Sequence, residues 1–101
     1  MNKKEYILCS AIHFDDGIEY AHQPNNIKTG YVICGMRHHN CFMTLAIISN
    51  RNETQLDYEK EQGFLTNINR FVDRKEGMLI AVNSGQVEKS EKLSLYSEDL
   101  Y

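Results

Sequence analysis

The chain has 101 residues, 42% of them hydrophobic, with 11 Lys and Arg against 14 Asp and Glu and a formal net charge of −3. This length predicts a single domain over residues 1–101, with a core small enough that oligomerisation would help it. Because there is no basic excess and no apolar run of about 20 residues, we expect neither binding to long nucleic acid nor a membrane span.

The N-terminal segment Met1–Glu5 is basic, but the apolar stretch and small-residue cleavage site of a signal peptide do not follow it. Three cysteines, an odd number in a chain without an export signal, are typical of free thiols in a reducing compartment. We therefore expect a cytoplasmic protein.

The first predicted element is a strand over Tyr6–Phe14, which ends at the turn Asp15–Gly17. Both of its alternating faces are mostly apolar, which is typical of a central strand. Residues Gly17–Lys28 contain the single proline and are predicted to form an ordered loop that could cover a pocket. A short second strand is predicted over Tyr31–Cys34.

A helix is predicted over His38–Ser49. Apolar residues occupy more than one of its stripes, so the helix is expected to be buried on most sides or to pack against a second subunit. The second alternative predicts a homodimer. Residues 50–61 are polar and are predicted to form a solvated connection.

Two short strands, Gly63–Thr66 and Arg70–Val72, are predicted to form a hairpin around an asparagine-rich turn that accepts left-handed backbone. A second helix is predicted over Arg74–Ser84. Asp73 is its expected N-cap, with a glutamate at the N3 position, and Gly85 is its expected end.

The second helix should face the sheet with Met78, Leu79, Ala81 and Val82, leaving Ile80 to one side. The C-terminal tail is rich in Tyr and Leu and is expected to dock on the domain. Together these elements predict an α+β fold, with a small antiparallel sheet and two main helices, in an oligomeric protein.

The segment Gly35–Phe42 gathers Arg37, His38, His39 and Asn40 at the start of the first predicted helix. Backbone N–H groups and cationic side chains at such a position could hold an anion. The segment lacks the glycines and the lysine of a phosphate-binding P-loop, which excludes that NTPase motif. A buried amphipathic helix with a polar first turn is the open alternative.

No set of residues predicts catalysis, a bound metal or a cofactor. Cys34, His38, His39 and Cys41 lie close together but lack the paired, two-ended spacing of structural zinc sites. No histidine is adjacent to an aspartate or is followed two residues later by Ser or Thr, as phosphodiester cleavage would favour. The cysteines lie in apolar stretches, where thiols are usually inert.

A binding site is better supported. Arg37, Arg70 and Arg74 offer guanidinium forks that suit phosphate. The side chains that could stack on a base or hydrogen-bond its edge are Phe64, Phe71, Tyr20, Tyr31, Asn40, Asn67 and Asn69. For each residue taken alone, an ordinary place on the surface or in the core is the simpler interpretation.

A further pattern covers most of the chain, in the segments Leu8–Gly17, Gly35–Phe42, Gln62–Thr66, Arg70–Glu76 and Leu95–Tyr101. These segments resemble a family of small phage proteins, the first-described anti-Thoeris sponges. Members of that family sequester the cyclic ADP-ribose isomers that bacterial TIR-domain immune enzymes make.

The resemblance implies a non-enzymatic α+β protomer in the cytoplasm of the infected host. It would form a homodimer, often a trimer of dimers, and would enclose a cyclic nucleotide signal at subunit interfaces without cleaving it. Some members are thought to hold cyclic oligonucleotides at separate pockets. By motif, Phe64, Arg70 and Arg74 would form the ADP-ribose pocket, and Arg37 and His38 would serve the second site.

Two other classes of function stay open. One is a phosphodiesterase that acts on the same cyclic nucleotides, which predicts turnover. The other is a protein-binding module that inhibits a host enzyme through its Tyr- and Leu-rich C-terminus and needs no nucleotide.

Overall fold

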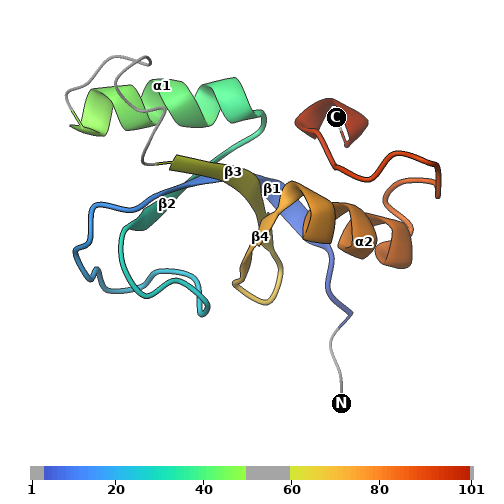
Figure 1. Cartoon of the computed structure of the whole chain (residues 1–101), viewed down its shortest axis with the longest axis horizontal. Helices are drawn as coiled ribbons and strands as arrows, with labels where there is room; N and C mark the ends of the chain where they lie inside the picture. The colour runs from blue at the N-terminus through green and yellow to red at the C-terminus, as the bar shows by residue number, and fades with distance from the viewer. Residues whose placement is uncertain (1–3, 50–59, 101) are drawn as a thin grey trace.

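The computed structural model describes residues 4–49 and 60–100. Its four-stranded antiparallel sheet has the order β2-β1-β3-β4, so β1 is central as predicted. The elements in chain order are β1 (Ile7–Phe14), β2 (Tyr31–Gly35), α1 (His38–Ser49), β3 (Lys60–Thr66), β4 (Phe71–Asp73), α2 (Arg74–Ser84) and a 3-10 turn, η2 (Ser97–Asp99) (Figure 1). This arrangement confirms the α+β prediction.

Strand β3 begins earlier than the sequence indicated. Lys60 pairs with Phe14 and Glu61 with His13, so these polar residues belong to the sheet and not to a solvated connection. Pairing with β1 determines where β3 begins, because a neighbouring strand can hold polar residues in a sheet although their β-propensity is low. The rest of the predicted connection, 50–59, lies outside the described residues.

Both helices cover one face of the sheet, which we call the helix face. Ser10 lies opposite Phe64, and Ile12 lies opposite both Ile33 and Gln62, so these alternate residues share that face. Helix α1 buries its apolar side against Ile12, Phe14 and Ile33. Helix α2 buries its apolar side against Ile7, Phe64 and Val72.

The other face, the loop face, is covered by the loop over residues 15–30, which lies on the far side of β1 and β2 from α1 (Figure 1). Its side-chain amides hydrogen-bond the backbone of both edge strands. Gln23 Oε1 accepts from Val32 N of β2 at 2.9 Å. Asn26 accepts from Phe71 N and donates to Phe71 O of β4, at 2.9 and 2.6 Å. The loop is therefore ordered, as predicted, and protects edges that would otherwise pair with another chain.

Asn26→Leu is expected to lower the free energy of unfolding by about 2 kcal/mol, because the Phe71 N–H and C=O groups would lose their partner. Urea unfolding followed by circular dichroism measures the change. A variant within the error of the parent protein would show that water replaces the amide without cost.

Helix α2 begins and ends at the predicted signals. Asp73 Oδ1 accepts from Glu76 N at 2.8 Å, and Gly85 takes the left-handed conformation with φ of 82°. Its buried side differs from the prediction, however. Ile80 is buried and Leu79 is 65% exposed.

Gly77 explains the shift of the buried side. A Cβ atom at Gly77 would lie 3.1 Å from Phe64 Cδ2 and 3.5 Å from Leu95 Cδ2. The helix therefore approaches the core most closely at the one residue that has no side chain. The buried side is centred on Gly77, Ile80 and Ala81, spaced by three and four residues.

The C-terminal tail docks on this cluster, as expected. Leu95 is fully buried, and its N–H donates to Arg74 O at 2.9 Å. Leu93 remains exposed. Leu100 packs against the same cluster, and Tyr101 lies outside the described residues.

Helix α1 is buried on one side only within the described chain. Cys41 and Leu45 are in the core, whereas Met43, Ile47 and Ile48 are exposed, Ile47 at 77%. Burial on most sides is thus not achieved within one protomer. The outer side of α1 stays apolar and open.

Candidate functional site at the start of helix α2

The strongest polar cluster lies at the first residue of α2, and we call it the Arg74 centre (Gln62, Arg74, Lys92, Tyr96 and Asp99). Arg74 Nη2 donates to Gln62 Oε1 at 2.6 Å, and the Arg74 guanidinium carbon lies 4.6 Å from the centroid of the Tyr96 ring. Arg74 Nε is buried and has no hydrogen-bond partner among the described residues. A buried N–H group of this kind favours an added acceptor.

The tail completes the centre. Lys92 Nζ lies 4.7 Å from the same Tyr96 ring and 2.8 Å from both carboxylate oxygens of Asp99. Asp99 also accepts from Tyr96 N at 2.8 Å. Burial alone would raise the pKa of Asp99. The hydrogen bonds from Lys92 and Tyr96 outweigh this effect and hold the pKa below its ordinary value. Asp99 thus balances the charge of Lys92, and the Arg74 guanidinium remains as the cation of the centre.

His38 lies next to this centre but cannot supply a second cation. It is buried, its Nε2–H donates to Gly63 O at 2.8 Å, and its ring stands edge-on to Phe64 with 5.1 Å between centroids. Burial lowers the pKa of His38, and the positive charge of Arg74 lowers it further. The imidazole is therefore neutral at pH 7, and the expectation of a cationic His38 is corrected.

His38 should make stability fall on acidification. The pKa of His38 is lower in the folded protein than in the unfolded chain, where it is about 6.5. The stability that the neutral imidazole contributes is therefore complete above this unfolded pKa and is lost as the pH falls toward the folded pKa. His38→Gln should flatten the slope of the thermal midpoint against pH in this window. The exposed His39→Gln should leave it unchanged, and equal slopes for the parent protein and His38→Gln would contradict the assignment.

The two predicted phenylalanines are core residues on opposite faces of the sheet. Phe64 is 0% exposed on the helix face. Phe71 is buried on the loop face, where its ring lies 5.8 Å from that of His13. Neither ring presents a free face on which a base could stack.

Arg70 is committed to the protein itself. Its Nε and Nη2 donate to the two Glu5 oxygens at 2.9 and 3.0 Å, and Nη2 also donates to Glu76 at 3.0 Å. The Arg70 hydrogen bond holds the pKa of Glu5 below its ordinary value. Arg70 thus ties the N-terminal segment to α2, at the opposite end of β4 from Arg74.

Arg37 and Asn40 shape the start of α1. Asn40 Oδ1 accepts from Arg37 N at 3.1 Å, which caps the first turn of the helix. Asn67 is similarly engaged, because its amide accepts from Tyr6 N and donates to Lys4 O. These amides serve the backbone in this structure.

Of the predicted site residues, the structure brings together Arg74, His38 and Phe64, and it separates Arg70 and Phe71 from them. The site residues predicted from the sequence do not include Gln62, Lys92, Tyr96 or Asp99. The only signal for Tyr96 was its place in an aromatic tail that was expected to dock. Nothing local distinguished Gln62.

The loop predicted to cover a pocket does line one. His22, Gln23 and Pro24 border a pocket of about 180 Å³, which Val32, Cys34, Leu65 and Asn69 complete. The two cysteines that lie near His38 and His39 in the sequence differ in burial, because Cys34 is exposed and Cys41 is buried. Over residues 4–49 and 60–100, no three His, Cys, Asp or Glu side chains gather as metal ligands.

Residues 6–101 match the phage T4 y16D protein family. The chain belongs to this family. The phage part of the resemblance is thereby confirmed for nearly the whole chain. No curated protein and no solved structure matches this y16D family member. None of its described helices is both long enough and apolar enough to cross a bilayer.

Proposed function

We propose that this phage protein is an anti-defence protein that binds and sequesters cyclic nucleotide immune signals without cleaving them. The first ligand class is the cyclic ADP-ribose isomers, and cyclic oligonucleotides are the second. The observation that carries the proposal is the Arg74 centre, where a guanidinium lies against an aromatic ring beside an amide and its Nε–H has no partner among the described residues.

Each part of the centre matches one part of such a ligand. Nε and Nη2 of Arg74 form a fork for two phosphate oxygens, which requires Gln62 to leave Nη2 and the buried Nε to be uncovered. Tyr96 offers a partly exposed ring to a base or ribose. The released Gln62 amide could then hydrogen-bond the ligand. Membership in a phage family is consistent with an anti-defence role, and the motif resemblance favours the same ligand class.

The proposal includes a homodimer, with a trimer of dimers as the larger assembly, in the cytoplasm of the infected host. The outer side of α1 offers the exposed Met43 and Ile47, and Ile48 is exposed near the end of the helix. Gln23 and Asn26 already hydrogen-bond the backbone of the two edge strands, which makes the apolar side of α1 the better dimer contact. Within α1 there is no Asp, Glu, Lys or Arg to repel an identical helix.

Ile47→Glu should weaken dimerisation at least tenfold, because it buries a charge in each half of a symmetric contact. Since Ile47 is exposed in the protomer, the thermal midpoint extrapolated to low concentration should not fall. Sedimentation velocity over a concentration series measures the change. A parent protein that stays monomeric at all concentrations would instead assign the outer side of α1 to a different protein, which is the second candidate function.

The sequestration itself is tested by capture. The protein is incubated with a TIR-derived cyclic ADP-ribose isomer, retained by filtration and heated, and the released compound is analysed. Unchanged ligand at about one molecule per subunit is expected. A linear or smaller product would mean a phosphodiesterase, and no retention of this ligand or of cyclic oligonucleotides would favour the protein-binding alternative.

A further inference from the structure

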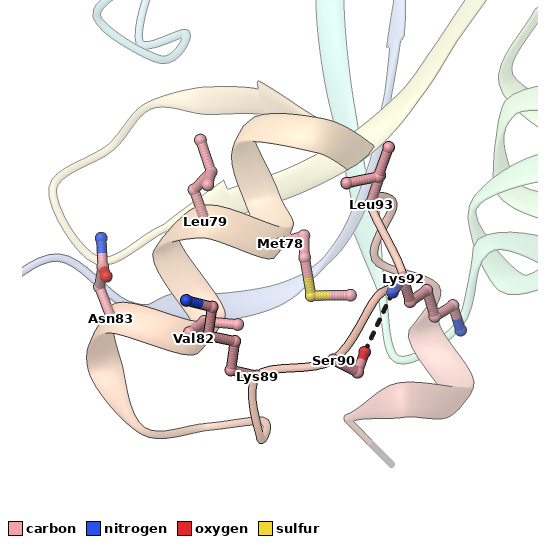
Figure 2. Close-up of a pocket in the computed structure, with 8 residues that line it drawn as sticks. All are labelled: Met78, Leu79, Val82, Asn83, Lys89, Ser90, Lys92 and Leu93. Atoms are coloured by element: carbon pink, nitrogen blue, oxygen red, sulfur yellow. Dashed lines mark hydrogen bonds between the residues drawn. The ribbon is translucent and has the colours of Figure 1, made fainter.

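A separate pocket of about 350 Å³ lies between α2 and the tail, and we call it the α2–tail pocket (Figure 2). Its walls are Met78 and Val82 of the helix and Leu93 of the tail. Figure 2 shows the Met78 side chain directed into the space between the helix and the tail segment that carries Ser90. The volume is at the lower end of the range for small-molecule sites, about 300–1,000 Å³.

Among the residues that the structure describes, one cation that borders this pocket has no partner. Lys89 makes no ion pair within the described part of the chain, and Figure 2 shows its side chain beside Val82. Lys92 also lines the pocket, but its ammonium is held by Asp99 at 2.8 Å and is directed away from Met78. No acidic side chain is among the described lining residues. The described lining therefore combines an apolar wall with one positive charge that is available to a ligand.

Two polar groups complete the rim. Ser90 Oγ accepts from Lys92 N at 3.2 Å, which leaves the hydroxyl proton as a donor. The amide of Asn83 lies on the helix side. A ligand carboxylate near Lys89 would lie at the same rim as the Ser90 hydroxyl and the Asn83 amide. The apolar part of the ligand would lie on Met78, whose flexible thioether adapts to irregular shapes.

The same lining argues against a nucleotide. Among the described residues that form the pocket there is no arginine for a diphosphate and no aromatic ring for a base. We infer that the α2–tail pocket binds a small amphipathic monoanion, an apolar acid of the medium-chain carboxylate class, independently of the Arg74 centre.

The test uses the fluorescent anion 1-anilinonaphthalene-8-sulfonate, its neutral analogue N-phenyl-1-naphthylamine, and decanoate as competitor, with the full-length protein. Lys89→Glu should weaken binding of the anionic probe at least tenfold and leave that of the neutral probe unchanged. Lys75→Glu, which makes the same charge change on the exposed side of α2, should behave like the parent protein. Decanoate should displace the anionic probe and raise the thermal midpoint, since a ligand of the folded state stabilises it.

Equal weakening in Lys89→Glu and Lys75→Glu would overturn the inference, because only the net charge would then matter. Failure of decanoate to displace the probe, or probe binding only where near-UV circular dichroism shows loss of tertiary structure, would overturn it as well. Leu93→Ala provides a second variant. Leu93 is exposed, so the protein should remain folded while both probes bind more weakly.

Discussion

Arg74→Ala should reduce capture of cyclic ADP-ribose by about 10- to 100-fold while the protein remains folded. The loss corresponds to about 1.5–3 kcal/mol, the contribution of hydrogen bonds to a charged group. The cost in stability should be smaller, about 1 kcal/mol, because the variant loses the contacts with Tyr96 and Gln62 at a partly exposed site. The hydrogen bond from Leu95 N to Arg74 O uses the backbone and is retained.

Two controls make this result specific. Lys75→Ala removes the same charge from the next, exposed residue of α2 and should capture ligand like the parent protein. Arg74→Lys keeps the charge but loses the fork, so it should remain strongly impaired. Ligand capture is measured by isothermal titration at matched folded fraction. Equal capture by Arg74→Ala and Lys75→Ala would show that the Arg74 centre is not the ligand site.

Phe64→Ala should lower the free energy of unfolding by about 3–5 kcal/mol, a large share of the stability of a domain of this size. Phe64 is fully buried, packs against Ile7, Val72 and Leu95, and touches the ring of His38. Removing its ring would leave a cavity that Gly77 cannot fill. Thermal or urea unfolding measures the effect.

Phe64→Leu separates a core role from a ligand role. It keeps an apolar side chain in the core, so it should lower the thermal midpoint moderately and leave capture per folded molecule unchanged. A residue that stacks on a ligand would show the reverse, with an unchanged midpoint and lost capture. That reverse result would restore the interpretation of Phe64 as a binding residue.

Local signals were enough to predict most elements. Asp73 and Gly85 bound α2 because an N-cap carboxylate and a left-handed glycine act on backbone groups a few residues away. Asn69 takes a φ of 61° in the predicted hairpin turn for the same kind of local reason. The buried side of α2 was predicted wrongly because it depends on tertiary contacts. Phe64 and Leu95, which are distant in the sequence, leave no room for a side chain at Gly77.

The candidate site was harder to predict because the two arginines of one motif look alike in sequence. Arg70 is neutralised by Glu5, which lies 65 positions away, whereas Arg74 meets Gln62 and Tyr96. The residues near each arginine in the sequence do not indicate these distant partners. The sheet register and the docked tail show which guanidinium keeps an N–H group with no partner among the described residues.

The most direct test of the account is the side-chain Nε–H resonance of Arg74 in a ¹H–¹⁵N spectrum, assigned with Arg74→Lys and followed as cyclic ADP-ribose is added. Because Arg74 Nε has no partner among the described residues, a phosphate oxygen that binds there should move this signal strongly downfield and slow its exchange with water. The Arg70 signal, already bound to Glu5, should stay in place. An unmoved Arg74 signal at saturating ligand would contradict phosphate binding at the Arg74 centre.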